Sequence, residues 1–312
     1  KIRARGVAMA MQGSSISNCD VGSVTVKLSD EGTYHITVGC TDMGTGCDTI
    51  IAQFAADVLE TPIDNISVYG VDTDISPYDS GSYASSTTYL TGMAAVKACE
   101  QLRERIIALA AVRMNKDAST LTFDGENVID ESDGAKMSLF DIATASMCNN
   151  EISLEVTYSH SSPVSPPPFM AACAEIEADP ETGAIELLDY TACVDCGTVV
   201  NTNLARVQTE GGLLQGIGMT LYEDIWYDER GKNLSNSFMQ YKVPSRLDTD
   251  RIRVEFDSSY EPTGPFGAKS IGEIVINTPA PAIADAVYNA TGVWINELPI
   301  TPEKILKGMK VI

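Results

Sequence analysis

Four short stretches carry residues whose types and spacing could do chemistry, and the most specific is GPFGAKSIGEIVINTPAPAIADAV at 264–287. In it Glu273 follows Gly272 and precedes three branched apolar residues, 274–276, just before a predicted helix. Apolar surroundings disfavour the ionised form of a carboxylic acid, which is how enzymes bring a general base nearer to the working pH. Glu273 is therefore a candidate base. A surface position, or an ion pair with Lys269, would explain the same residues.

Two loops combine glycine or hydroxyl side chains with a following helix. TDMGTG at 41–46 places Gly44, Thr45 and Gly46 where a strand passes into a helix, and such glycines let the backbone approach an anionic ligand. SGSYASSTTYLTG at 80–92 has five serine and threonine side chains within seven positions, which suits a polar ligand with many acceptors. A tight turn in the first loop and a helix N-cap in the second explain these residues without a ligand.

The fourth stretch is a helix with two glutamines, and a pair of cysteines outside the four stretches is a weaker candidate. In ARVQTEGGLLQGIG, at 205–218, Gln208 and Gln215 lie seven positions apart, on one face of a largely apolar helix. A buried glutamine amide needs partners, which can be backbone groups or a ligand. CVDC at 193–196 has the spacing of a redox pair, but it follows a strand and not a helix entry. A single pair of cysteines cannot build a zinc site.

Periodicity predicts an α+β fold of two related lobes, each a mixed sheet with helices packed on one face. The first lobe is predicted over residues 1–160. Alternating apolar residues over 24–28 and 34–38 indicate a hairpin with one buried face. Apolar residues at helical spacing over 50–59 and 95–109 indicate two helices.

The second lobe, residues 161–312, repeats this plan. SSPVSPPPF at 161–169 holds four prolines and predicts an extended linker. A hairpin with its turn at PETG is predicted over 171–195, followed by a glycine-interrupted helix over 203–223. A last helix over 279–290 ends before a glycine.

Charge and cysteine content exclude several classes of protein. The formal net charge of −22 would repel a nucleic acid, but backbone amides can still hold a phosphate-bearing cofactor. The sequence has no run of 18 apolar residues and no signal-peptide pattern, so neither a membrane span nor secretion is expected. Eight cysteines in 312 residues are not a disulfide scaffold or an iron–sulfur grouping. We expect mostly buried, reduced thiols and a cytoplasmic protein.

In their order, these stretches resemble the C-terminal part of the molybdenum hydroxylase large subunit, in the xanthine dehydrogenase and aldehyde oxidoreductase family. The most specific pieces are GAKSIGE, VNTNLARVQTEGGLLQGIGMTLYE and TGVWINELPITPEKIL, and the resemblance covers nearly the whole chain. A chain of this length is similar to the medium molybdopterin subunit of nicotinate dehydrogenases. In those enzymes the molybdenum-binding polypeptide is divided between two subunits.

The resemblance implies a role for each matching residue. Glu273 matches the glutamate that acts as base at the molybdenum centre, and Gln208 matches a glutamine that contacts the pterin. MGTG matches an MGQG loop that touches the cofactor, with Thr45 in place of the glutamine. Lys269 and Gly272, in the GAKSIGE motif, are further expected cofactor contacts. No residue is expected to ligate the metal. Four residues of the hydroxyl-rich loop are expected to line the pterin and its phosphates: Ala84, Ser85, Ser86 and Thr87.

The implied function is that of a molybdenum hydroxylase subunit acting on an electron-poor N-heterocycle. The expected reaction converts nicotinate to 6-hydroxynicotinate with water as the oxygen source. Oxidation of xanthine, another purine or an aldehyde is an alternative. The expected cofactor is a molybdenum–molybdopterin cytosine dinucleotide with a sulfido or selenido ligand. Electrons would pass to Fe–S clusters and FAD on partner subunits, with NADP as acceptor, and a larger molybdopterin subunit is a further partner.

Two alternative functions of other classes also agree with the sequence. The chain could be a non-catalytic scaffold that binds only the tail of the cofactor. It could also be an independent thiol–disulfide protein that uses Cys193 and Cys196.

Overall fold

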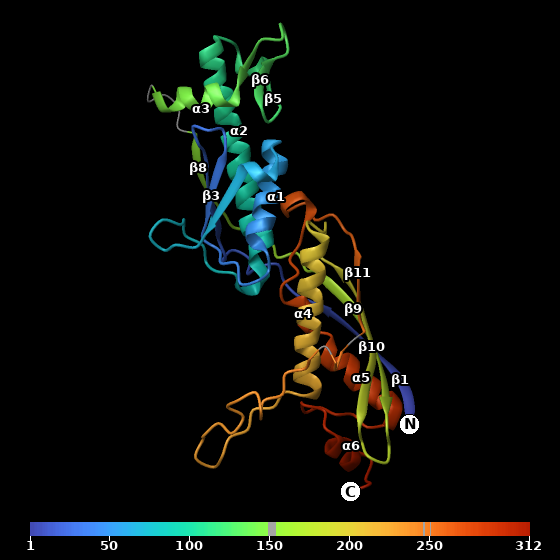
Figure 1. Ribbon diagram of the computed structural model, residues 1–312. Coiled ribbons are helices and arrows are strands. Elements are labelled where there is room, and N and C mark those ends of the chain that lie inside the picture. The colour runs from blue at the N-terminus through green and yellow to red at the C-terminus, as the bar shows by residue number, and fades with distance from the viewer. Residues whose placement is uncertain (149–153, 246, 250) are drawn as a thin grey trace. The chain divides into compact units, whose positions relative to one another are not determined.

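The protein combines helices with mixed sheets, which confirms the predicted α+β class (Figure 1). The computed structural model describes residues 1–148, 154–245, 247–249 and 251–312.

The chain folds into two compact units. Unit 1 consists of residues 1–12, 167–260 and 271–312, and unit 2 of residues 13–166 and 261–270. The units are therefore assembled differently from the predicted lobes. The first strand of the chain joins the unit of the second half, and ten residues of the second half join the unit of the first. The chain passes from unit 2 to unit 1 within the proline-rich stretch 161–169, whose residues 161–168 form no helix or strand, as the linker prediction requires.

Unit 1 is built on a four-stranded mixed sheet. β9 lies between β1 and β10 and is antiparallel to both, whereas β11 is parallel to β10. The predicted hairpin with its turn at PETG is the β9–β10 pair. In the order in which they hydrogen-bond, the strands are β1 (Ile2–Met11), β9 (Phe169–Ala178), β10 (Ile185–Asp195) and β11 (Ile252–Asp257).

Three α-helices complete the described part of unit 1. The predicted glycine-interrupted helix is α4 (Thr202–Leu221), which begins where the Asn201 side chain accepts a hydrogen bond from the backbone of Leu204 at 3.1 Å. The predicted last helix is α5 (Pro279–Thr291); it ends at Gly292, whose φ of 75° suits glycine. The third is the short α6 (Pro302–Gly308).

Helix α5 packs directly on strand β1. A Cβ atom at Gly6 would lie 2.1 Å from the carbonyl oxygen of Ala282, so only glycine permits this approach. The core of unit 1 then forms between the sheet and the helices, with Ile176 and Tyr190 of the sheet and Ile283 of α5 fully buried.

Unit 2 repeats this architecture with different strands. β2 is antiparallel to β3 and β8, and β4 is parallel to β3. The predicted hairpin is the β2–β3 pair. In hydrogen-bonded order, the strands are β4 (Ile66–Gly70), β3 (Tyr34–Val38), β2 (Gly22–Leu28) and β8 (Glu155–His160).

The two predicted helices of unit 2 are also present. They are α1 (Cys47–Leu59) and α2 (Gly92–Met114), and both pack on the apolar face of the sheet. A small antiparallel sheet and a helix that the sequence did not indicate follow α2. They are β5 (Leu121–Phe123), β6 (Asn127–Asp130), β7 (Lys136–Ser138) and α3 (Leu139–Cys148).

None of the helices in the described ranges is both long enough and apolar enough to cross a membrane.

Candidate functional site

A cavity of about 470 Å³ in unit 1 contains the strongest candidate from the sequence. One side is α4, which contributes Gln208, Gly211 and Gln215. The other side is the segment that carries Glu273, and Gln12 joins from the end of β1. The prediction that Gln208 and Gln215 share one helix face is confirmed, because both line this cavity.

Two glutamines fix the position of Glu273. The Nε2 atom of Gln12 donates to Oε2 of Glu273 at 3.2 Å. The Nε2 atom of Gln208 donates to the backbone oxygen of Gly272 at 3.0 Å. The amide of Gln208 thus has a backbone partner, which was one of the two possibilities raised by the sequence. Through that partner it anchors the residue immediately before Glu273.

The sequence left two positions open for Glu273, apolar surroundings or the surface, and within this chain it lies at the surface. Ile274 and Val275 are buried, but Glu273 is exposed. The physical reason is local. Glu273 precedes the 3-10 turn Ile274–Ile276, and the first two side chains of that turn enter the core while the carboxylate faces the cavity.

The glycines of α4 let this turn approach the helix. A Cβ atom at Gly212 would lie 2.2 Å from Cγ2 of Val275, and one at Gly216 would lie 2.6 Å from Cγ of Pro279. Gly211 differs, because a Cβ atom there would meet nothing within 4 Å. Gly212 and Gly216 are therefore needed for packing, whereas Gly211 keeps the cavity side of the helix open.

Gln12 is a site residue that sequence reasoning missed. Its only local signal is a polar side chain directly after the apolar residues 7–11, followed by Gly13 and two serines. Its hydrogen-bond partner, Glu273, lies 261 positions away in the sequence.

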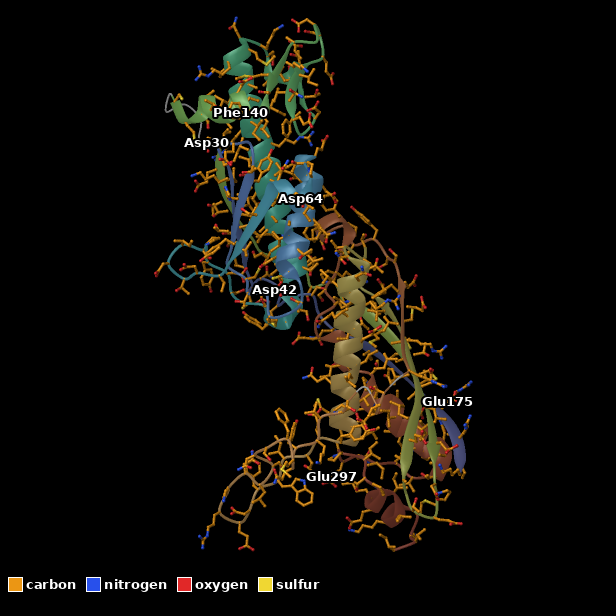
Figure 2. All side chains as sticks on the ribbon, viewed as in Figure 1. Asp30, Asp42, Asp64, Phe140, Glu175 and Glu297 are labelled. Carbon is orange, nitrogen blue, oxygen red and sulfur yellow. The ribbon has the colours of Figure 1, made fainter. Side chains whose placement is uncertain are left out.

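In unit 2, the TDMGTG loop binds its own aspartate. The Asp42 carboxylate accepts hydrogen bonds from the backbone N–H groups of Gly44, at 2.9 Å, and Gly46, at 3.1 Å (Asp42 is labelled in Figure 2). Partial burial opposes ionisation, yet these donors hold the pKa of the Asp42 carboxyl below its usual value. Two of the amides predicted to face an anionic ligand are therefore engaged within the loop. The predicted cofactor contacts of Gly44, Thr45 and Gly46 stay predictions.

This loop and the first residues of α1 hold the one group of acidic and sulfur ligands with metal-like spacing in the described part of the chain. Atoms of Asp42, Cys47 and Asp48 lie within 4.8 Å of one another. Burial and the nearby Asp42 charge raise the pKa of the Asp48 carboxyl, and the Cys47 thiol donates to it at 3.6 Å. Because these groups are bonded to one another and to the loop, we assign no metal to them.

The hydroxyl-rich loop has an unusual backbone. Ala84 and Ser85 have φ of 51° and 57°, a left-handed conformation that non-glycine residues rarely adopt. A π-helical turn, Thr87–Thr91, follows directly and leads into α2. The buried Ser86 hydroxyl donates to the oxygen of Gly81 at 2.9 Å and so shapes the loop. Left-handed residues and π-turns are enriched at functional sites, which supports a binding role for this loop.

The GAKSIGE motif is divided between the units. Lys269 and Ser270 belong to unit 2, and both are buried. Ser270 is held by Ser14, whose hydroxyl lies 2.9 Å from that of Ser270. Gly272 and Glu273 belong to unit 1.

The predicted site residues thus form two groups. Gln208, Gly272 and Glu273 meet in the cavity of unit 1. Unit 2 carries the others, which are Gly44, Thr45, Gly46, Ala84, Ser85, Ser86, Thr87 and Lys269.

The cysteine pair does not form a redox site of the usual kind. Cys193 is exposed on β10, and Cys196 is buried just after it. Reactive pairs have a thiol at a helix N-terminus, which stabilises the thiolate, and a strand end does not provide this. No disulfide joins any of the eight cysteines, all of which lie in the described ranges. Four of them are buried, fewer than the sequence led us to expect.

Known proteins resemble this chain over nearly its full length. Residues 1–250 match the model of the molybdopterin cofactor-binding domain family. The chain is 38% identical over 310 residues to the protein named "Probable hypoxanthine oxidase XdhD" of Escherichia coli K12, covering 99% of this chain and 32% of that protein. It is 31% identical to the 6-hydroxypseudooxynicotine dehydrogenase complex subunit gamma of Paenarthrobacter nicotinovorans, covering 96% of this chain and 39% of that subunit.

Among solved structures, quinoline 2-oxidoreductase from Pseudomonas putida 86 superposes with a TM-score of 0.90 at 26% identity. The match covers 99% of this chain and 42% of that one. The chain therefore spans 32% to 39% of the length of the curated relatives just described.

Proposed function

Because the chain belongs to the molybdenum hydroxylase family, and corresponds to the C-terminal part of its large subunit, we propose that it supplies the catalytic base of such an enzyme. The base is Glu273. The observation that carries this proposal is the position of the Glu273 carboxylate. It lies in the same cavity as Gln208 and Gln215, and Gln12 and Gln208 fix it there.

The cavity fits the polar ring system of a molybdopterin. Amide side chains both donate and accept hydrogen bonds, which suits the mixed donor and acceptor edge of a pterin. Gln208 and Gln215 would hold that edge, and Gly211 adds no side chain to the cavity between them. When bound, the cofactor supplies the two-electron redox chemistry, and the protein supplies position and electrostatics. In unit 2, the strained backbone at Ala84 and Ser85 supports a contact of the hydroxyl-rich loop with the cofactor phosphates.

Within this arrangement, Glu273 accepts the proton that is released as oxygen from water is transferred to the substrate. A positioned base contributes about 10²- to 10⁴-fold in rate. Gln12 holds the carboxylate oxygen, and Gln208 holds the backbone at Gly272 so that the carboxylate keeps its direction. Fixing a reacting group in this way lowers the entropy lost in the transition state.

The substrate class that we propose is an electron-poor N-heterocycle, with hydroxylation of nicotinate to 6-hydroxynicotinate as the reaction. Support comes from the relatives, because hypoxanthine and quinoline, which appear in their names, are both N-heterocycles. Oxidation of xanthine, another purine or an aldehyde would use the same residues and remains the alternative, since no residue of the cavity singles out a pyridine carboxylate.

The same proposal includes the partners and the details of the cofactor. One matched relative is by name the subunit of a complex. We therefore propose a larger molybdopterin subunit, an Fe–S subunit and an FAD subunit as partners in the cytoplasm, with NADP as the final acceptor. The proposed cofactor is the cytosine dinucleotide, with a sulfido or selenido ligand on molybdenum. Mass spectrometry of the native complex, combined with metal analysis, reports the subunits, molybdenum, selenium and the nucleotide together.

Replacing Glu273 tests the proposal. In the assembled enzyme, Glu273→Gln keeps the size and the hydrogen-bonding capacity of the side chain but removes its basicity. We expect normal molybdenum and pterin content with a loss of turnover of at least about 100-fold. The control is Glu303→Gln, which alters an exposed carboxylate of α6 that is paired with Lys307, and should leave turnover unchanged.

The same variant separates the enzyme from the scaffold. A scaffold that only binds the tail of the cofactor would keep full turnover in Glu273→Gln, and that result would rule out Glu273 as the base. For the thiol–disulfide reading, alkylation of the exposed Cys193 should leave hydroxylase turnover intact, and the chain should show no disulfide-exchange activity.

A further inference from the structure

An exposed arm in unit 1 has a surface suited to a protein partner. Residues 224–245 follow the end of α4 and precede β11. In Figure 1 this orange segment projects from the end of α4, away from the sheet of its own unit. The arm is a feature of unit 1 alone, so its description does not depend on unit 2.

The arm exposes an unusual number of large apolar side chains. Seven of its 22 residues are large hydrophobics that are between 48% and 82% exposed: Ile225, Trp226, Tyr227, Leu234, Phe238, Met239 and Val243. Single exposed apolar residues are normal on a protein surface, but a concentration of them marks an interaction site. Tryptophan, tyrosine, phenylalanine and methionine are also the residues enriched in interface cores.

The arm is held in shape by its own hydrogen bonds. The backbone N–H of Leu234 donates to the oxygen of Trp226 at 2.7 Å, and that of Asp228 donates to Lys232 at 3.0 Å. At its base, the hydroxyl of Tyr241 donates to Glu223. A preformed segment loses less conformational entropy on binding. More of the free energy gained by burying its apolar side chains is then available for affinity.

The charge of the arm differs from that of the whole chain. Three acidic and three basic residues give the arm a formal net charge of zero, whereas the whole chain carries −22. These residues are Asp224, Asp228, Glu229, Arg230, Lys232 and Lys242. Two copies of so acidic a chain repel each other over their whole surfaces, which disfavours a second copy as the occupant. A neutral apolar arm is instead suited to a different polypeptide.

We propose that the arm is the docking element for the larger molybdopterin-binding polypeptide, with Trp226 and Phe238 as its anchors. This inference rests on the proposed function. It is supported by length, because the chain spans only 32% to 39% of the curated relatives described above, so most of such a polypeptide lies outside residues 1–312.

The test measures binding between the full chain and the larger subunit, both purified from the complex. Truncating a central aromatic anchor costs about 2 kcal/mol or more, and each 1.4 kcal/mol is tenfold in affinity. The double variant Trp226→Ser/Phe238→Ser should therefore raise the dissociation constant at least about 100-fold. Because both side chains are exposed, the circular dichroism spectrum and melting temperature of the free chain should not change.

A matched control comes from unit 2. Tyr78 is 76% exposed but lies outside the arm, so Tyr78→Ser should keep the dissociation constant within about twofold of wild type, far below the effect of losing an anchor. An unchanged dissociation constant in the double variant would overturn the proposal. Sedimentation of the wild-type chain alone is a second measurement, which tests whether the chain forms a dimer. A dimer that the double variant abolishes would identify a second copy as the occupant and also overturn it.

Molybdenum analysis of the wild-type complex tests the proposed function separately, because it does not depend on the arm variants. A complex that contains molybdenum and binds the double variant normally refutes only the docking element. A complex without molybdenum refutes the proposed function, whatever the arm variants do.

Discussion

The side-chain amide of Gln12 donates to the Glu273 carboxylate at 3.2 Å, although the two residues are 261 positions apart in the chain. Gln12 follows the last residue of β1, and Glu273 precedes the turn that leads into α5. The close packing of α5 on β1 at Gly6 brings these two ends together. The position of the proposed base is thus set by the core of unit 1 and not by its own loop alone.

Loss of the Gln12 amide should lower turnover without lowering substrate affinity. In Gln12→Ala the carboxylate loses the donor that directs it, and we expect kcat to fall about tenfold with KM unchanged, as for the loss of one hydrogen bond to a charged group. Gln12→Glu should be worse than Gln12→Ala, because it places a second negative charge beside the base. Steady-state kinetics of the assembled enzyme measures both.

The control for Gln12 is Gln101→Ala, which removes a half-buried glutamine of α2 that does not line the cavity. Its kinetics should match wild type. If Gln12→Ala raises KM and leaves kcat intact, Gln12 contacts the substrate and does not position the base.

A second prediction concerns Gln208. In Gln208→Leu the backbone oxygen of Gly272 loses its donor at 3.0 Å, which costs about 1 kcal/mol and loosens the segment before Glu273. If Gln208 also contacts the pterin, the cofactor content of the purified complex should fall. Gln215→Leu, at the same cavity, leaves the Gly272 hydrogen bond in place and should reduce the cofactor content less. Equal cofactor content in wild type and Gln208→Leu would argue against a cofactor contact.

The sequence predicted the parts of the site that depend on local spacing. Gln208 and Gln215 share a helix face because seven residues make about two turns. The strand pairs and the main helices followed from periodicity in the same way. Local pattern carries this information because neighbouring residues in one element share its geometry.

What the sequence could not predict depends on contacts between distant segments. Gln12 can be recognised as a site residue only when the packing of β1 near the turn before α5 is known. The left-handed backbone of Ala84 and Ser85 is invisible because neither residue is a glycine. For Glu273 the sequence left apolar surroundings and a surface position both open, and its neighbours could not decide between them. Apolar neighbours in sequence do not surround a side chain that points the other way.

The glycines of α4 offer a matched pair for stability. In Gly212→Ala the new methyl would lie 2.2 Å from Cγ2 of the buried Val275, whose branched side chain has little freedom to move. We expect a loss of about 1–3 kcal/mol in the free energy of unfolding. In Gly211→Ala the methyl meets nothing within 4 Å, so the better helix propensity of alanine should stabilise by about 0.5–1 kcal/mol. Urea unfolding of both variants measures the contrast, and equal stabilities would contradict this account of the packing.

The last prediction concerns acid sensitivity in unit 2. Asp130 is almost fully buried, and its carboxylate accepts hydrogen bonds from the Ser132 hydroxyl at 2.6 Å and the Ser132 backbone at 2.9 Å. Lys116 adds an ion pair at 2.9 Å. The Ser132 hydroxyl and Lys116 together hold the pKa of the Asp130 carboxyl well below its usual 3.8.

A carboxyl whose pKa is lower in the folded state adds stability above its unfolded pKa, and this contribution is lost as the pH falls through the folded pKa. The contribution of Asp130 is therefore complete at neutral pH and disappears as the pH falls below about 5. Asp130→Asn should lower the urea midpoint at pH 7, and between pH 5 and about 2 its midpoint should fall less steeply than that of wild type. Asp57→Asn, at an exposed position of α1, is the control and should follow wild type. Parallel pH curves for wild type and Asp130→Asn would show that the buried carboxylate is not what makes this unit sensitive to acid.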